Sequence, residues 1–143
     1  MIYIDTREKK NAHIIRYFDR NGIAYERKKL DVCDYAAGTN ILIERKQNLL
    51  ELAGNITKEN GRRIKAEFTR VPPGSKVYVL IEEDIGGLKN VTNWHSAHIK
   101  LSGVTLYNYM IGYQKRHNLQ YIFCHKSISG RMIAELLEVQ HGK

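Results

Sequence analysis

The sequence predicts an α/β fold in which helices cover both faces of a mixed β-sheet. Apolar segments of strand length alternate along the chain with segments of helical periodicity, as in layered α/β proteins. The chain has 143 residues, a usual size for one domain, and no repeat or linker rich in Ser, Pro and Gly divides it. We therefore expect a single domain over residues 1–143.

Five segments are predicted as strands, because their apolar side chains alternate or form a short continuous run. Ile2 and Ile4 share one face of the first strand. The run over residues 77–81 is apolar throughout, which suits a strand buried on both faces. The predicted strands cover residues 1–5, 24–32, 41–46, 77–81 and 121–124.

Helices are predicted where apolar side chains recur at i, i+3 and i+4. Ile14, Tyr17 and Phe18 have this spacing, and the pair Asn21-Gly22 ends their helix. The predicted helices cover residues 11–20, 47–57, 62–70, 105–117 and 127–140.

The strands at 24–32 and 41–46 make the sheet mixed. The turn at residues 37–40 is too short for a crossover, so these two strands must be antiparallel. The helical connections elsewhere permit parallel pairs. Residues 86–102 have no clear periodicity, and no function is assigned to them.

The balance of charge narrows the class of partner. The chain has 23 Lys and Arg against 15 Asp and Glu, a formal charge of +8, which favours a polyanion such as nucleic acid. Cys33 and Cys124 are too few for a disulfide framework or a cysteine-based zinc site. No apolar run approaches the ~20 residues of a membrane span, and the N-terminus has no signal-peptide core. We expect a protein that is not secreted and has no membrane partner.

The strand at 41–46 ends in residues that suggest chemistry. Glu44 and Lys46 are two positions apart and project from one face, whereas Arg45 points to the other. Asp34, just before the turn that leads into this strand, is placed to converge on Glu44. Carboxylates can hold Mg²⁺ or Mn²⁺, and a lysine can assist at a scissile phosphate. The alternative is an ordinary surface ion pair between Glu44 and Lys46.

Four segments in a fixed order resemble the nuclease domain of the XPF family of structure-specific endonucleases, in the PD-(D/E)xK superfamily. They are Asp5-Thr6-Arg7-Glu8, Asp34-Tyr35, Glu44-Arg45-Lys46 and Gly61-Arg62-Arg63. The resemblance implies restriction-endonuclease-like α/β/α layers around a central mixed sheet. It also implies a metal-dependent endonuclease that cuts branched, flapped or otherwise structured DNA.

The resemblance carries over to individual residues. It implies that Asp5, Asp34 and Glu44 bind Mg²⁺ or Mn²⁺, and that Asp34, Glu44 and Lys46 are catalytic. The residues implied to support the site are Arg7, Glu8, Arg45 and Glu51. Glu8 either contacts the metal or steadies Arg45 or Lys46.

Two positions depart from the family pattern. Cys33 stands where the family has glycine, and a cysteine does not easily adopt a positive φ. The family's acidic residue after the Glu-Arg-Lys triplet falls on Leu50, or on Glu51 if one residue is inserted, and we prefer Glu51.

Basic residues follow this triplet on the helix predicted at 62–70. The candidates for contact with the DNA backbone are Arg62, Arg63, Lys65 and Arg70. The alternative is that they form an ordinary solvated helix face.

The sequence ends at Lys143 without the tandem helix-hairpin-helix domain of many family members, so we expect a standalone nuclease domain. The family's pairing suggests a homodimer, or a partner protein that supplies specificity. We expect a cytoplasmic protein associated with the nucleoid, or an intracellular protein encoded by a phage.

Two alternative functions use the same basic surface. One is a catalytically silent DNA-binding or assembly module that retains the nuclease fold. The other is RNA binding without chemistry. The presence of Asp5, Asp34, Glu44 and Lys46 together favours the nuclease.

Overall fold

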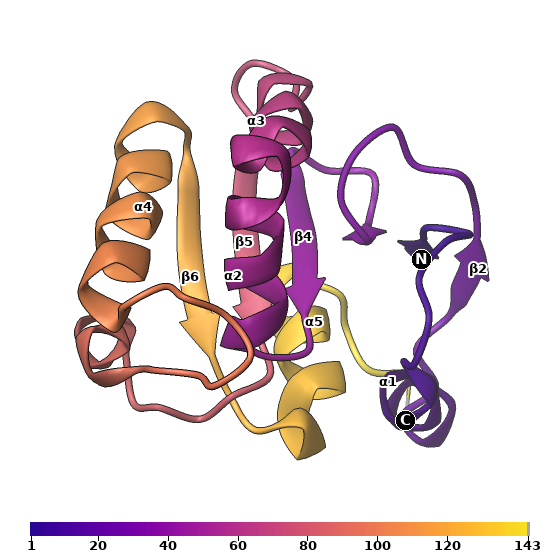
Figure 1. The fold of residues 1–143 in the computed structure, drawn as a ribbon. Coiled ribbons are helices and arrows are strands. Elements are labelled where there is room, and N and C mark those ends of the chain that lie inside the picture. The colour runs from indigo at the N-terminus through magenta and orange to yellow at the C-terminus, as the bar shows by residue number, and fades with distance from the viewer. Residues whose placement is uncertain (143) are drawn as a thin grey trace.

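A six-stranded sheet forms the centre of the molecule (Figure 1). The computed structural model describes residues 1–142, with the backbone alone described at Asn60. The strands follow one another across the sheet in the order β2-β1-β3-β4-β5-β6. Their bounds are β1 Ile2–Ile4, β2 Tyr25–Arg27, β3 Tyr35–Ala36, β4 Ile41–Lys46, β5 Lys76–Ile81 and β6 Leu119–Phe123.

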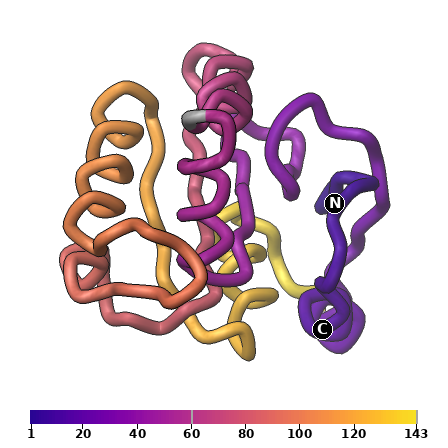
Figure 2. The backbone as a smooth tube through the Cα atoms, in the orientation of Figure 1, coloured from indigo at the N-terminus to yellow at the C-terminus, as the bar shows by residue number. Residues whose placement is uncertain are grey.

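Helices cover both faces of the sheet, which confirms the predicted α/β/α layers. The α-helices are α1 Ala12–Arg20, α2 Leu49–Thr57, α3 Arg62–Thr69, α4 Gly103–Arg116 and α5 Ser129–Leu136. Helices α2, α3 and α4 share one buried apolar cluster with the sheet, and α1 and α5 share the other. The C-terminal segment returns to α1, where the N–H of Gly142 donates to the carbonyl of Asn21 at 2.9 Å (Figure 2). Among the described residues, no helix has the length and apolar character that crossing a membrane requires.

The sheet is mixed, as predicted. Strand β1 is parallel to β2 and antiparallel to β3, and β3 is antiparallel to β4. Strands β4, β5 and β6 are all parallel, joined by helical connections.

The strand predicted over residues 24–32 is wrong in extent and in partner. Strand β2 ends at Arg27 and pairs with β1, and the antiparallel partner of β4 is the two-residue β3. The chain leaves the sheet after Arg27, and Asp5 accepts the N–H of Leu30 at 2.9 Å, which holds this connection apart from β4.

The last helix is shorter than the predicted 127–140. A short 3₁₀ helix, η3 (Lys126–Ile128), precedes α5, which ends at Leu136. Glu138 has a φ of 59°, in the left-handed region, and this conformation prevents the helix from continuing.

Alternation along β4 decides which residues meet which layer. Ile43 belongs to the apolar cluster on the α1 and α5 side, and Leu42 packs against the cluster on the α2 and α3 side. Glu44 and Lys46 therefore face α2 and α3, and Arg45 faces α1 and α5.

Candidate active site

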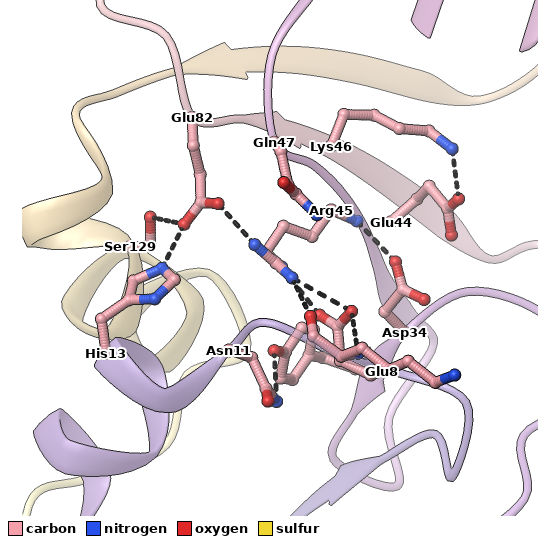
Figure 3. Close-up of polar contacts among 12 residues, drawn as sticks. Glu8, Asn11, His13, Asp34, Glu44, Arg45, Lys46, Gln47, Glu82 and Ser129 are labelled. Atoms are coloured by element: carbon pink, nitrogen blue, oxygen red, sulfur yellow. Dashed lines mark hydrogen bonds and ion pairs between the residues drawn. The ribbon is translucent and has the colours of Figure 1, made fainter. Parts of the chain in front are cut away.

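Glu44 and Lys46 form an ion pair at the carboxyl end of β4 (Figure 3). The Nζ atom of Lys46 lies 3.0 Å from Oε2 of Glu44, and the two side chains are only 12% and 8% exposed. Burial would lower the pKa of Lys46, but the negative charge of Glu44 outweighs this effect and raises it. The pair is buried and charged, which excludes the ordinary surface ion pair considered from the sequence.

Asp34 lies beside this pair because of an unusual turn. Cys33 has a φ of 68°, so this cysteine takes the left-handed conformation that glycine would favour, contrary to the expectation from the sequence. The N–H of Asp34 then donates to the carbonyl of Ile43 at 2.8 Å, and its Oδ2 accepts the N–H of Arg45 at 2.8 Å. Burial raises the pKa of Asp34, and the charge of Glu44 raises it further.

Glu67 is a site residue that the sequence motifs did not indicate. It projects from α3 into the cleft that Glu44 and Lys46 line. Burial raises the pKa of Glu67, and the charge of Glu44 adds to the effect, so the two carboxyl groups are near neighbours. The signal in the sequence was its position three residues after Ile64, which places it on the inward side of a basic helix.

The cleft has a volume of about 380 Å³ and mixes both signs of charge. It is lined by Glu44, Lys46, Asn55, Lys58, Arg63, Ile64, Ala66, Glu67 and Arg70. Of the four predicted DNA-contacting residues, Arg63 and Arg70 line it. Arg62 forms an exposed ion pair with Glu59, and Lys65 lines a different hollow, with Tyr109 of α4.

Asp5 is next to Asp34 in the sheet but is already engaged by other groups. Its N–H donates to the carbonyl of Asp34 at 2.9 Å. Its carboxylate accepts the Nε–H of Arg7 at 2.8 Å and the N–H of Leu30 at 2.9 Å. Burial alone would raise the pKa of Asp5, but these hydrogen bonds outweigh it and lower the pKa. Within residues 1–142, no three His, Cys, Asp or Glu side chains form a ready-made metal site. The assignment of Asp5 as a ligand stays a prediction.

The donor atoms in the cleft nevertheless suit a divalent cation. Oε1 of Glu44 is buried and has no hydrogen-bond partner among the described residues, and the same holds for Oδ1 of Asn55. Buried acceptors normally have a partner, so two that lack one in a single cleft leave room for a cation. Carboxylate and amide oxygens are the ligands that Mg²⁺ and Mn²⁺ prefer.

Arg45 is the centre of a network on the opposite face of the sheet (Figure 3). Its guanidinium donates to Glu8 through Nε at 2.8 Å and also to Glu82, and its side chain is 3% exposed. Glu82 also accepts hydrogen bonds from His13 and Ser129, which lie on α1 and α5. Glu8 therefore steadies Arg45, and neither residue faces the cleft. Glu82 was not predicted from the sequence.

Two further predicted supporting residues have local structural contacts. Arg7 is 66% exposed and holds Asp5. Oε1 of Glu51 accepts the N–H of Gln47 at 2.8 Å, and Oδ1 of Asn48 accepts the N–H of Glu51 at 2.8 Å. Asn48 therefore caps the first turn of α2, and Glu51 ties this turn to Gln47, the residue before the cap.

Comparisons with known proteins concern the family and the fold of the chain. The model of the ERCC4 domain family matches residues 4–136. XPF from Aeropyrum pernix superposes with a TM-score of 0.73 at 16% identity, covering 96% of this chain and 59% of that chain. XPF from Aeropyrum pernix in complex with DNA gives a TM-score of 0.72 at 17% identity, covering 96% and 62%. The chain thus spans about three-fifths of each solved chain. No curated protein gives a significant match. The superpositions confirm the predicted fold.

Proposed function

The chain belongs to the ERCC4-domain family, and we propose that it is a divalent-metal-dependent DNA endonuclease. The observation that carries the proposal is the environment of Glu44. One oxygen binds Lys46, the other has no protein donor among the described residues, and Asp34 lies alongside. Carboxylates next to a lysine in a cleft with a basic rim suit the hydrolysis of a phosphodiester.

Each site residue has a role in this proposal. Asp34 and Glu44 hold Mg²⁺ or Mn²⁺, which when bound stabilises the charge that develops on the phosphate. Lys46 keeps its proton beside Glu44, so its ammonium group is available to the scissile phosphate or to the attacking water. Asp5 joins the ligands when its carboxylate exchanges its contacts with Arg7 and the N–H of Leu30.

The basic residues of α3 support a nucleic-acid substrate. Arg63 and Arg70 line the cleft and are exposed, so their guanidinium groups can pair with phosphate oxygens on either side of the scissile bond. Arg62 and Lys65 extend the positive surface along α3. We propose DNA with branches or flaps as the preferred substrate, and a homodimer or a partner protein as the source of further specificity.

The test is a cleavage assay on plain, nicked, flapped, forked and Holliday-junction DNA with Mg²⁺, Mn²⁺ or EDTA. We expect cleavage with either metal and none in EDTA. The variants Asp34→Ala, Glu44→Ala and Lys46→Ala should lose it. Glu135→Ala, which removes an exposed carboxylate on α5 across the sheet, should cut like the wild type.

Other outcomes would contradict the proposal. If the wild type cuts nothing, or if the three variants cut as well as the wild type, the nuclease assignment fails. DNA binding that persists in EDTA without cleavage would support the silent module. A preference for RNA that is indifferent to Glu44→Ala would support RNA binding.

A further inference from the structure

The cleft contains a carboxylate oxygen that the protein leaves without a donor. Glu44 is 6% exposed, and its Oε1 has no hydrogen-bond partner among the described residues. Its other oxygen, Oε2, contacts Lys46. A buried charged oxygen without a partner costs stability, so the unpaired side of Glu44 indicates a ligand position.

Glu67 of α3 lines the same cleft as Glu44. Burial raises the pKa of Glu67, and the charge of Glu44 raises it further, as expected for two carboxyl groups in one cleft. Two ionised carboxylates in one cleft repel each other. A divalent cation between them would remove the repulsion.

Asn55 of α2 contributes a third oxygen to the same cleft. Its Oδ1 is buried and also lacks a hydrogen-bond partner among the described residues. Basic side chains such as Lys58 and Arg70 share the cleft, but they donate no hydrogen bond to Oε1 of Glu44 or to Oδ1 of Asn55. Two carboxylates and an amide oxygen, contributed by β4, α2 and α3, form an oxygen-only donor set suited to Mg²⁺ or Mn²⁺.

We propose that Glu67 is a ligand of the divalent cation, which it shares with Glu44, and that Oδ1 of Asn55 is a further ligand. The inference rests on the proposed metal-dependent function. It adds residues that lie outside the motifs from which that function was inferred.

This placement links the cation to the basic rim. Arg63 is four residues before Glu67 and Arg70 is three after it, so all three share one side of α3 and its end. A cation bound to Glu67 would fix the helix that presents both arginines. It would also remove negative charge from the cleft before a phosphate enters.

The test is a Mn²⁺ titration of the full chain without DNA, with free Mn²⁺ measured by electron paramagnetic resonance. We expect Glu67→Gln, which keeps the size of the side chain, to weaken Mn²⁺ binding at least about tenfold. Asn55→Leu should weaken it by a smaller factor. Glu135→Gln is the matched control on an exposed helix face, and should bind Mn²⁺ like the wild type.

A second variant separates ligation from charge. Glu67→Asp keeps the charge and withdraws the carboxylate by one methylene, so a ligand role predicts weaker Mn²⁺ binding and a purely electrostatic role predicts wild-type binding. Circular dichroism melts without metal should show that Glu67→Gln remains folded and no less stable, since it removes a like-charge contact.

Wild-type Mn²⁺ affinity in either Glu67→Gln or Glu67→Asp would overturn the inference, as would a wild-type protein that binds no Mn²⁺. Its failure is distinguishable from failure of the proposed function. Binding that depends on Glu67 without any DNA cleavage would support the inference and reject the nuclease. If Glu67→Gln changes neither DNA cleavage nor Mn²⁺ binding, the result would support the nuclease and reject the inference.

Discussion

The Nζ atom of Lys46 lies 3.0 Å from Oε2 of Glu44, on a strand whose intervening residue, Arg45, is buried on the other face. One short strand thus supplies two separate networks. Glu44 and Lys46 meet the cleft under α2 and α3, and Arg45 ties the strand to α1 and α5. A change at any of the three residues acts on a single network, so chemistry and stability can be tested separately.

Lys46→Met should remove cleavage without removing the cation. The ammonium group is the only cationic partner that the structure gives Glu44 among the described residues, so its loss leaves both oxygens of Glu44 free for metal. We expect cleavage to fall at least about 100-fold, a typical effect of losing a group that assists proton transfer or stabilises charge. Mn²⁺ affinity should stay unchanged or rise. Single-turnover cleavage and a Mn²⁺ titration check this, with the exposed Lys126→Met as control. Full activity of Lys46→Met would contradict it.

Glu82→Gln should destabilise the protein, by an amount that depends on pH. Burial would raise the pKa of Glu82, but hydrogen bonds from Ser129 and His13 and the charge of Arg45 outweigh it and lower the pKa. Because the pKa is lowered in the folded protein, the carboxylate stabilises the fold at pH values above its ordinary pKa of 4.5. This contribution to stability is lost as the pH falls through the pKa of the folded state. At pH 7 the free energy of unfolding of the variant should be lower by about 3 kcal/mol, the low end for breaking a buried ion pair. The effect is at the low end because Arg45 keeps its ion pair with Glu8.

Urea unfolding of wild type and Glu82→Gln between pH 3 and pH 8 measures this difference. The gap in the free energy of unfolding should narrow as the pH falls below about 4.5. Glu135→Gln, in an exposed pair with Arg131, should change stability by less than about 0.5 kcal/mol at every pH. A gap that is constant with pH would show that the charge of Glu82 contributes nothing.

Cys33→Gly should be more stable than Cys33→Ala. Both variants lose the buried thiol and differ only in Cβ, and the φ of 68° disfavours a Cβ by about 1 kcal/mol. Glycine also gains entropy in the unfolded chain, which reduces the advantage. Chemical unfolding of the two variants checks the order. Equal stabilities would indicate that the turn before Asp34 relaxes when the thiol is removed.

The strand that bears the chemistry was predictable because its alternation is local. Glu44 and Lys46 share a face whatever the rest of the fold does, since successive side chains of a strand point to opposite faces. The order of the motifs indicated the family. The pairing of β2 was not predictable, because β3 has only two residues and its place between β1 and β4 depends on contacts across the sheet.

The sequence motifs did not indicate Glu67 and Glu82 for a similar reason. Each meets the site only through tertiary packing, 23 residues from Glu44 and 37 from Arg45 respectively, by subtraction of their numbers. Glu51 is the converse case, because a motif and not packing indicated it. Its supporting role at the site stays a prediction, and its carboxylate accepts the N–H of Gln47 at the start of α2.

Arg63→Ala should weaken DNA binding in a way that salt reveals. Arg63 is exposed, lines the cleft and has only a long contact, 3.8 Å, with Glu59, so its guanidinium is free to pair with a phosphate. Removing one phosphate pairing makes the slope of log affinity against log salt shallower by about 0.9 for duplex DNA. The measurement is fluorescence anisotropy of a labelled flap in Ca²⁺ or EDTA, from about 50 to 200 mM salt. Arg131→Ala, on α5 across the sheet, is the matched control and should keep the wild-type slope. If Arg63→Ala keeps the wild-type slope and Arg131→Ala makes it shallower, DNA binds the α5 side, and the cleft beside α3 is not the DNA-binding face.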